Sequence, residues 1–217
     1  MDERLFVDEK LYCEGKPKPW FRGKIHLVSL VFIAPAIYFS QNNIWSHINI
    51  ITNFCCFGVS GIYHTFTWSP RAEIMLQKLD HQMISAWCVG MMMPIAFNLF
   101  EPGVRAKFLT ALLATFLANS YATWSCKPST MISSSIPATL LLFLDECWKH
   151  MNFVEWTSML LVFGFQIAGT MAYTMSNKGY KIFGNDEIYG YHELFHTLSL
   201  FAAFFVYMVN YHITMRT

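Results

Sequence analysis

Hydrophobic residues fall into seven runs, separated by short polar or Pro- and Gly-containing segments. Most runs are about 17–25 residues long and the first has about 16, lengths that are typical of membrane-spanning helices. The predicted spans are residues 25–40, 44–66, 74–99, 104–124, 130–146, 154–175 and 190–213. Lipid offers no partner to exposed backbone groups, and the runs are too long for barrel strands. The pattern therefore predicts an all-α, integral membrane seven-transmembrane helix bundle.

The short connections leave no room for a separate soluble domain. We therefore divide the chain into an N-terminal tail, residues 1–24, and a seven-helix transmembrane domain, residues 25–214. Three prolines inside the spans, Pro35, Pro94 and Pro137, predict kinks because proline removes a helical hydrogen bond.

Five polar side chains interrupt the hydrophobic runs. Ser60 and His64 are four residues apart in the second span, and His192 and His196 are four apart in the seventh. Four residues is about one helical turn, so each pair lies on one helix face. Asp80 lies near the start of the third span. Ionisable side chains are costly inside a membrane and usually mark a site, so these five are the candidate functional residues.

The distribution of Lys and Arg between alternate loops predicts the orientation. The side that holds the N-terminal tail carries eleven of these residues and the opposite side carries four. Cytoplasmic loops are enriched in Lys and Arg, so we expect a cytoplasmic N-terminus. The second span then ends, and the third and seventh spans begin, at the cytoplasmic edge. At 1.5 Å per residue, the five polar residues lie within about 10 Å of one another in depth.

Composition supports the membrane prediction and narrows the function. Hydrophobic residues make up 54% of the 217-residue chain and charged residues only 13%, against about 25% charged in soluble domains. The net charge is +1 and no basic run occurs, so nucleic-acid binding is not supported. The six cysteines include no C-x-x-C pair, and we expect them to be reduced residues of the apolar segments.

The five polar residues have the chemistry of a catalytic zinc site. The three imidazoles of His64, His192 and His196 can bind zinc and leave a fourth position for water. Bound zinc lowers the pKa of water to about 7, and Asp80 is placed to take the proton. Ser60 can orient the water or a substrate carbonyl. This combination predicts metal-assisted hydrolysis at the inner edge of a membrane, where a lipid amide or ester can enter laterally.

Structural roles are the alternative for each of these residues. Membrane histidines often form interhelical hydrogen bonds, Asp80 can do the same, and Ser60 with Gly61 also suits close helix packing. Four further histidines at span ends are expected in interfacial positions: His26, His47, His150 and His212. The helical rotation of about 100° per residue turns His81 away from Asp80.

Residues 192–196 also match a second zinc pattern. They read His-Glu-Leu-Phe-His, the H-E-x-x-H pattern of zinc metalloproteases, in which Glu193 would be the general base. That interpretation leaves Ser60 and His64 without a role. We therefore favour the site built from three helices, with Glu193 as a neighbour.

The same residues resemble the progestin and adipoQ receptor family, which includes the haemolysin III proteins. The shared features are Ser-x3-His on the second helix, Asp at the start of the third and His-x3-His on the seventh. The motif sequences are most similar to those of haemolysin III proteins at Tyr63-His64, Leu79-Asp80-His81 and His192 to His196. The resemblance covers about residues 20–215.

This resemblance implies a seven-helix bundle with a cytoplasmic N-terminus. It also implies zinc on His64, His192 and His196, with Asp80 near the metal-bound water and Ser60 beside it. The family commonly has Gly-Thr-Tyr-Thr-Pro after the aspartate, whereas this chain has Met91-Met92-Met93 between Gly90 and Pro94. A more apolar cavity wall is expected there.

Three functions follow as hypotheses. The first is a zinc-dependent, ceramidase-like hydrolase of a lipid amide, with ceramide or a related sphingolipid as substrate. The second is a signalling receptor or membrane-homeostasis regulator in which zinc is structural. The third is a cytolytic haemolysin. It rests on the resemblance to haemolysin III proteins alone, since no amphipathic spans suggest a pore.

Overall fold

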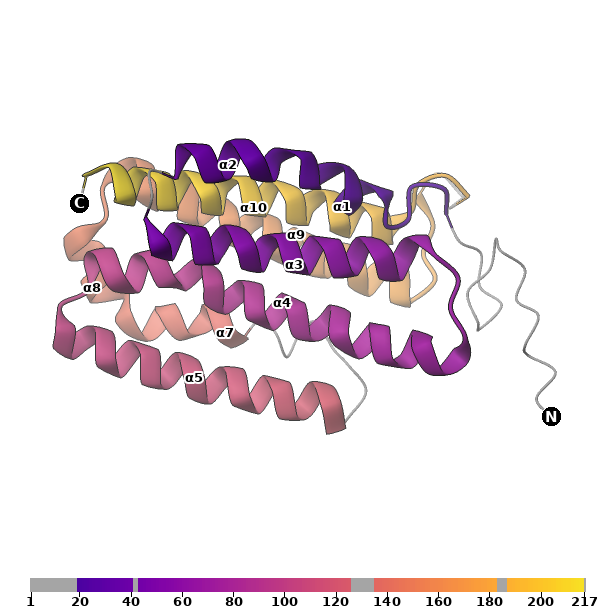
Figure 1. The fold of residues 1–217 in the computed structure, drawn as a ribbon, viewed down its shortest axis with the longest axis horizontal. Helices are drawn as coiled ribbons and strands as arrows, with labels where there is room; N and C mark the ends of the chain where they lie inside the picture. Colours follow the sequence, from indigo (N-terminus) through magenta and orange to yellow (C-terminus); the bar gives the residue numbers. More distant parts are fainter. Residues whose placement is uncertain (1–18, 41–42, 126–134, 183–186, 217) are drawn as a thin grey trace.

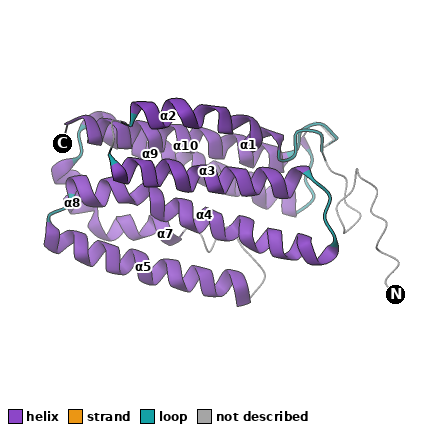
Figure 2. Ribbon diagram, viewed as in Figure 1, coloured by secondary structure: helices purple, strands orange, loops and turns teal. Residues whose placement is uncertain are grey.

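Helices make up all the regular structure that the computed structural model describes, which covers residues 19–40, 43–125, 135–182 and 187–216 (Figures 1 and 2). In these ranges the helices form seven rods. The first four rods are α1 (Lys24–Ser29) with η2 (Leu30–Phe32) and α2 (Ile33–Phe39), then α3 (Ile44–Thr65), α4 (Pro70–Leu99) and α5 (Pro102–Ser125). The last three are α7 (Ser135–Ala138) with η3 (Thr139–Phe143) and α8 (Leu144–His150), then α9 (Phe153–Asn177) and α10 (Tyr191–Arg216).

The all-helical prediction is confirmed, and each rod coincides with one predicted span. Residues 130–134 and most of the tail 1–24 lie outside the described residues. Among the described helices, α4, α9 and α10 are long and apolar enough to cross a membrane. Crossing by all seven rods and a cytoplasmic N-terminus remain predictions.

Helix boundaries follow local capping chemistry. α4 begins four residues before the predicted position because Ser69 caps it and Pro70 occupies its first turn, where a missing N–H costs nothing. Asn43 caps α3 by accepting from the backbone N–H groups of Trp45 and Ser46. Asn152 and Glu155 form a reciprocal capping box that starts α9.

The three prolines for which kinks were predicted lie in different local helical structure. Pro35 follows the 3-10 turn of η2, which contains Val31, the residue whose carbonyl loses its helical partner to the proline. Pro137 lies in α7, directly before the 3-10 segment η3. α4 continues as α-helix through Pro94.

Two helices organise the packing. α10 contacts α1, α3, α4 and α9, and α4 contacts α3, α5, α7 and α10. In Figure 1, α3 lies between α10 and α4, and α5 lies at the far edge against α4. The apolar core between these helices includes Phe57, Trp87, Met92, Ile95 and Phe108. The end of α3 and the start of α10 meet at the same end of the bundle (Figure 1).

The contact between α3 and α4 depends on Gly90. A Cβ atom at this position would lie 1.9 Å from the hydroxyl oxygen of Thr52. The two helices are therefore in direct contact where any larger residue would separate them.

We predict that Gly90→Ala lowers the stability of the bundle by about 1–3 kcal/mol, because the added methyl group overlaps Thr52. The measurement is denaturant unfolding in detergent micelles. Gly58→Ala on α3 is the matched control, since nothing lies within 4 Å of a Cβ there. Adding Thr52→Ala to Gly90→Ala should recover much of the loss. Equal stability of the Gly90 and Gly58 variants would contradict the close contact.

Candidate metal centre

Three histidine rings form a triangle at one end of the bundle. His64 comes from the last turn of α3, and His192 and His196 come from the first turns of α10. The ring centroids are 4.8 Å apart for His64 and His192, 5.0 Å for His64 and His196, and 4.7 Å for His192 and His196. One ligand nitrogen from each ring can be chosen so that all three lie within 4.8 Å of one another. This group can bind a metal ion.

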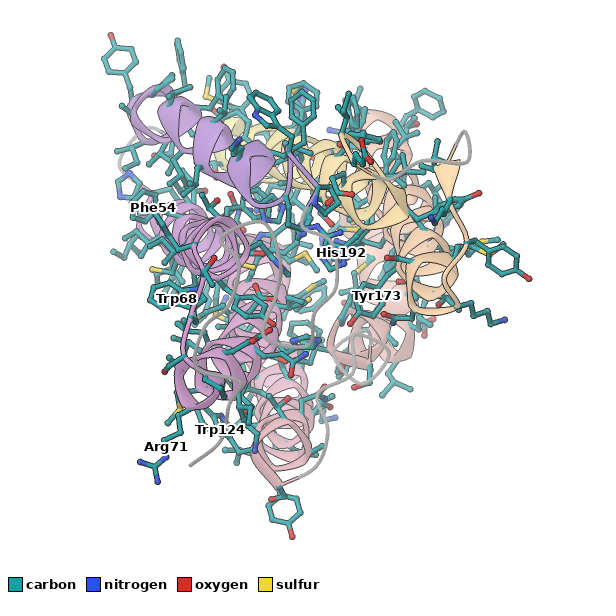
Figure 3. The ribbon with its side chains drawn as sticks, turned by 90° about the vertical axis from the view of Figure 1, so that its right-hand side faces the viewer. Phe54, Trp68, Arg71, Trp124, Tyr173 and His192 are labelled. Atoms are coloured by element: carbon teal, nitrogen blue, oxygen red, sulfur yellow. The ribbon has the colours of Figure 1, made fainter. Side chains whose placement is uncertain are left out.

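The hydrogen-bonding state of these rings fits a metal. The Nε2 atoms of His192 and His196 are buried and have no hydrogen-bond partner among the described residues. A buried polar atom without a partner is costly, and a metal ion satisfies an imidazole nitrogen directly. Viewed from this end of the bundle, His192 lies near the middle of the cross-section with Tyr173 beside it, whereas Arg71 points outward (Figure 3).

Asp80 and Ser60 lie beside the triangle. The Asp80 carboxylate oxygen Oδ2 is 3.7 Å from Nε2 of His64, and Oδ1 is buried without a hydrogen-bond partner in the described ranges. Ser60 is buried one turn before His64, and it lines the same cavity as Asp80. The structure thus brings all five sequence-predicted residues to one place. His81, expected to turn away, still has its Nδ1 atom 3.9 Å from Asp80.

Glu193 is occupied by structural contacts. Its fully buried carboxylate forms an ion pair with the Arg22 guanidinium and accepts a 2.8 Å hydrogen bond from the backbone N–H of Gly190. The first contact ties the segment before α1 to α10, and the second caps the start of α10. Both oxygens are therefore engaged, which favours the interpretation of Glu193 as a neighbour of the metal group.

The interfacial role expected for His26 is wrong. Its ring is only 4% exposed, stacks on Phe57 with a centroid distance of 4.4 Å, and places Nε2 3.2 Å from Nδ1 of His196. Sequence reasoning missed this residue because a position near a span end says nothing about which way the helix face points. Arg22 was missed because no local pattern in the sequence links it to Glu193.

A cavity of about 770 Å³ adjoins the histidine group. Ser60, Asp80 and His196 are among the polar residues that line it. The rest of the wall is mostly apolar and includes Trp87, Met91, Met92, Met159, Val162 and Phe163. The methionines Met91 and Met92 are therefore both core residues and cavity wall, in agreement with the apolar lining expected from the sequence.

The cavity reaches the outside of the bundle between two rods. Leu141 of η3 and Ile167 and Met171 of α9 line it, and each of these side chains is more than half exposed. The lining of the cavity therefore extends from the histidine group to exposed apolar side chains on η3 and α9.

Comparison with protein families agrees with this arrangement. Residues 15–207 match the family model described as haemolysin-III related. The chain belongs to the haemolysin III-related family. This membership confirms the resemblance inferred from the short motifs around His64, Asp80 and His192, and the matched residues agree with the range of about 20–215 over which it was expected. Family membership and the three long apolar helices together support a membrane protein.

We predict that the purified haemolysin III-related protein carries one transition-metal ion per chain, and that His64→Ala, His192→Ala and His196→Ala each lose it. Removing one imidazole leaves too few ligands for a stable site. Elemental analysis by mass spectrometry measures the stoichiometry, with His212→Ala near the opposite end of α10 as control. Full metal content in all three site variants would contradict the assignment.

We also predict that Glu193→Gln lowers the free energy of unfolding by about 3 kcal/mol, because it leaves the Arg22 cation without its buried counter-charge. The double variant Arg22→Met/Glu193→Leu should recover part of this loss. Unfolding in detergent micelles provides the measurement. A Glu193→Gln protein that is as stable as the original but hydrolytically dead would instead support Glu193 as the general base.

Proposed function

We propose that this haemolysin III-related protein is a multi-pass membrane enzyme that binds zinc through His64, His192 and His196 and hydrolyses a lipid amide such as ceramide. In this proposal all seven rods cross the membrane and the N-terminus is cytoplasmic, as the Lys and Arg distribution predicts. The observation that carries the proposal is the junction of the buried histidine group with a large, mostly apolar cavity.

The donor set favours zinc. Imidazole nitrogen suits zinc, copper, iron and nickel, and the described residues around the group supply no thiolate ligand. Among these metals zinc has no redox chemistry and accepts three histidines with one open position, as hydrolases require. When bound there, zinc supplies Lewis acidity and activated water at neutral pH.

Asp80 is the proposed proton acceptor. Its carboxylate lies beside His64, is buried and has one oxygen, Oδ1, with no hydrogen-bond partner in the described part of the chain. A carboxylate in this position can hold a water molecule and take its proton as the amide carbonyl is attacked. The same group can then return the proton to the departing amine.

Ser60 is the proposed positioning group. It lines the cavity together with Asp80, so a substrate carbonyl bound there is within reach of its hydroxyl. Its expected contribution is smaller than that of Asp80, because it neither binds the metal nor carries the proton.

The cavity supports a lipid substrate. Its volume falls in the range of small-molecule sites, about 300–1,000 Å³. Its wall is mostly apolar, and its lining reaches exposed side chains of η3 and α9. An amphiphile with its amide at Asp80 and its hydrocarbon chain against Trp87 and Met92 would satisfy both parts of the wall.

We predict that the zinc-loaded protein in lipid nanodiscs releases fatty acid from ceramide or a related sphingolipid. His192→Ala, which removes a metal ligand, and Asp80→Asn, which removes the general base, should each lower kcat/KM by at least about 100-fold, the lower end of the range for general base catalysis. Asp80→Asn should keep its metal, which separates the base from the ligands. Ser60→Ala should retain more activity than either.

One control variant and two possible outcomes make this assay decisive. His212→Ala should hydrolyse lipid at the wild-type rate. Undiminished turnover in both His192→Ala and Asp80→Asn would contradict the proposed site. Absence of turnover across a lipid panel in zinc-loaded protein would contradict hydrolysis and favour a receptor or regulator with structural zinc.

A further inference from the structure

His26 contacts the metal group from outside it. It belongs to α1, whereas the three candidate ligands belong to α3 and α10. Its Nε2 atom lies 3.2 Å from Nδ1 of His196, a hydrogen-bonding distance, and the two rings are nearly perpendicular. We propose that His26 is a positioning residue: it accepts the Nδ1–H hydrogen bond of His196 and so directs Nε2 of His196 to the metal. This inference rests on the metal-binding part of the proposed function.

The two nitrogens of His196 have different surroundings. Nδ1 faces His26, whereas Nε2 is buried with no hydrogen-bond partner among the described residues. A neutral imidazole carries one proton, and only the nitrogen without it can bind a metal. An acceptor at Nδ1 therefore holds the proton there and leaves Nε2 as the ligand atom. Metal-binding histidines in general have such a partner, which fixes both the tautomer and the ring orientation.

His26 is held in place by contacts with neighbouring helices. Its ring stacks on Phe57 of α3 with an interplanar angle of 17°. The start of α1 also packs closely on α3, since a Cβ at Gly23 would lie 2.7 Å from the carbonyl oxygen of Gly61. An acceptor fixed in this way loses little conformational entropy when it forms the hydrogen bond.

The segment before α1 is tied to the start of α10 and to the residues just before it. The backbone N–H groups of Trp20 and Phe21 donate to the carbonyl oxygens of Glu187 and Ile188, and the Arg22 side chain pairs with Glu193. These contacts set the position of α1 along α10, and with it the distance between His26 and His196. The first rod therefore contributes to the metal site although it supplies no ligand.

His26 is not a fourth ligand in this geometry. The group of nitrogens that can share one ion comprises His64, His192 and His196. The Nε2 atom of His26 is directed at His196, and its Nδ1 atom is buried without a hydrogen-bond partner in the described ranges. Because His26 also lines the cavity, Nδ1–H can donate to a water or substrate oxygen there.

The test is metal affinity in the purified full-length protein, measured by zinc competition and by the electronic spectrum of bound cobalt(II). His26→Phe keeps an aromatic ring for stacking and removes the acceptor. It should weaken zinc binding by 10–100-fold, the usual effect of losing such a partner, and change the cobalt spectrum. His26→Gln should recover part of the affinity, because the Gln side-chain oxygen can take the place of Nε2.

The matched control is His212→Phe, which makes the same replacement near the other end of α10 and should bind zinc like the wild type. Unchanged zinc affinity and an unchanged cobalt spectrum in His26→Phe would overturn the inference. Equal losses in His26→Phe and His26→Gln would also overturn it, because they would indicate packing rather than a hydrogen bond.

Failure of this inference can be distinguished from failure of the proposed function. Wild-type protein that binds zinc without hydrolysing lipid overturns the hydrolase proposal alone. Wild-type protein that binds no transition metal overturns both. Normal hydrolysis and normal zinc affinity in His26→Phe overturn the role of His26 alone.

Discussion

Burial of imidazole nitrogens in an apolar bundle is the constraint on which the candidate metal centre of this protein depends. A buried polar atom must find a partner, and the Nε2 atoms of His192 and His196 have none among the described residues. The surrounding helices hold these atoms together instead of separating them. A metal ion would satisfy both nitrogens. The Asp80 carboxylate beside them has the same requirement, because its Oδ1 atom is also buried without a hydrogen-bond partner among the described residues. The cost of burying the group is an argument that the group has a function.

The contacts around the histidines form a continuous support. α3 and α10 supply the rings, α4 supplies Asp80, and α1 supplies His26. The buried ion pair of Arg22 with Glu193 joins the start of α1 to the start of α10. The ligands are therefore held by contacts with two other rods, those of α1 and α4, as well as by their own helices, which is the condition for a preorganised site.

Much of the fold could be predicted from the sequence because hydrophobic run length is a strong signal in a chain of membrane helices. The motifs also predicted the grouping of His64, Asp80 and His192, since i,i+4 spacing and span direction together determine depth. The early start of α4 was missed because the Ser69–Pro70 cap lies outside the apolar run. His26 was missed because its role depends on the rotation of α1 against α10, a tertiary property that no local pattern encodes.

The central claim, a zinc ion on three histidines, is tested most directly by X-ray absorption at the zinc edge of the purified protein. We expect one zinc per chain with nitrogen or oxygen neighbours at about 2.0–2.1 Å and the multiple scattering of three imidazole rings. Zinc with sulfur neighbours at about 2.3 Å, or with one or no imidazole, would contradict the account.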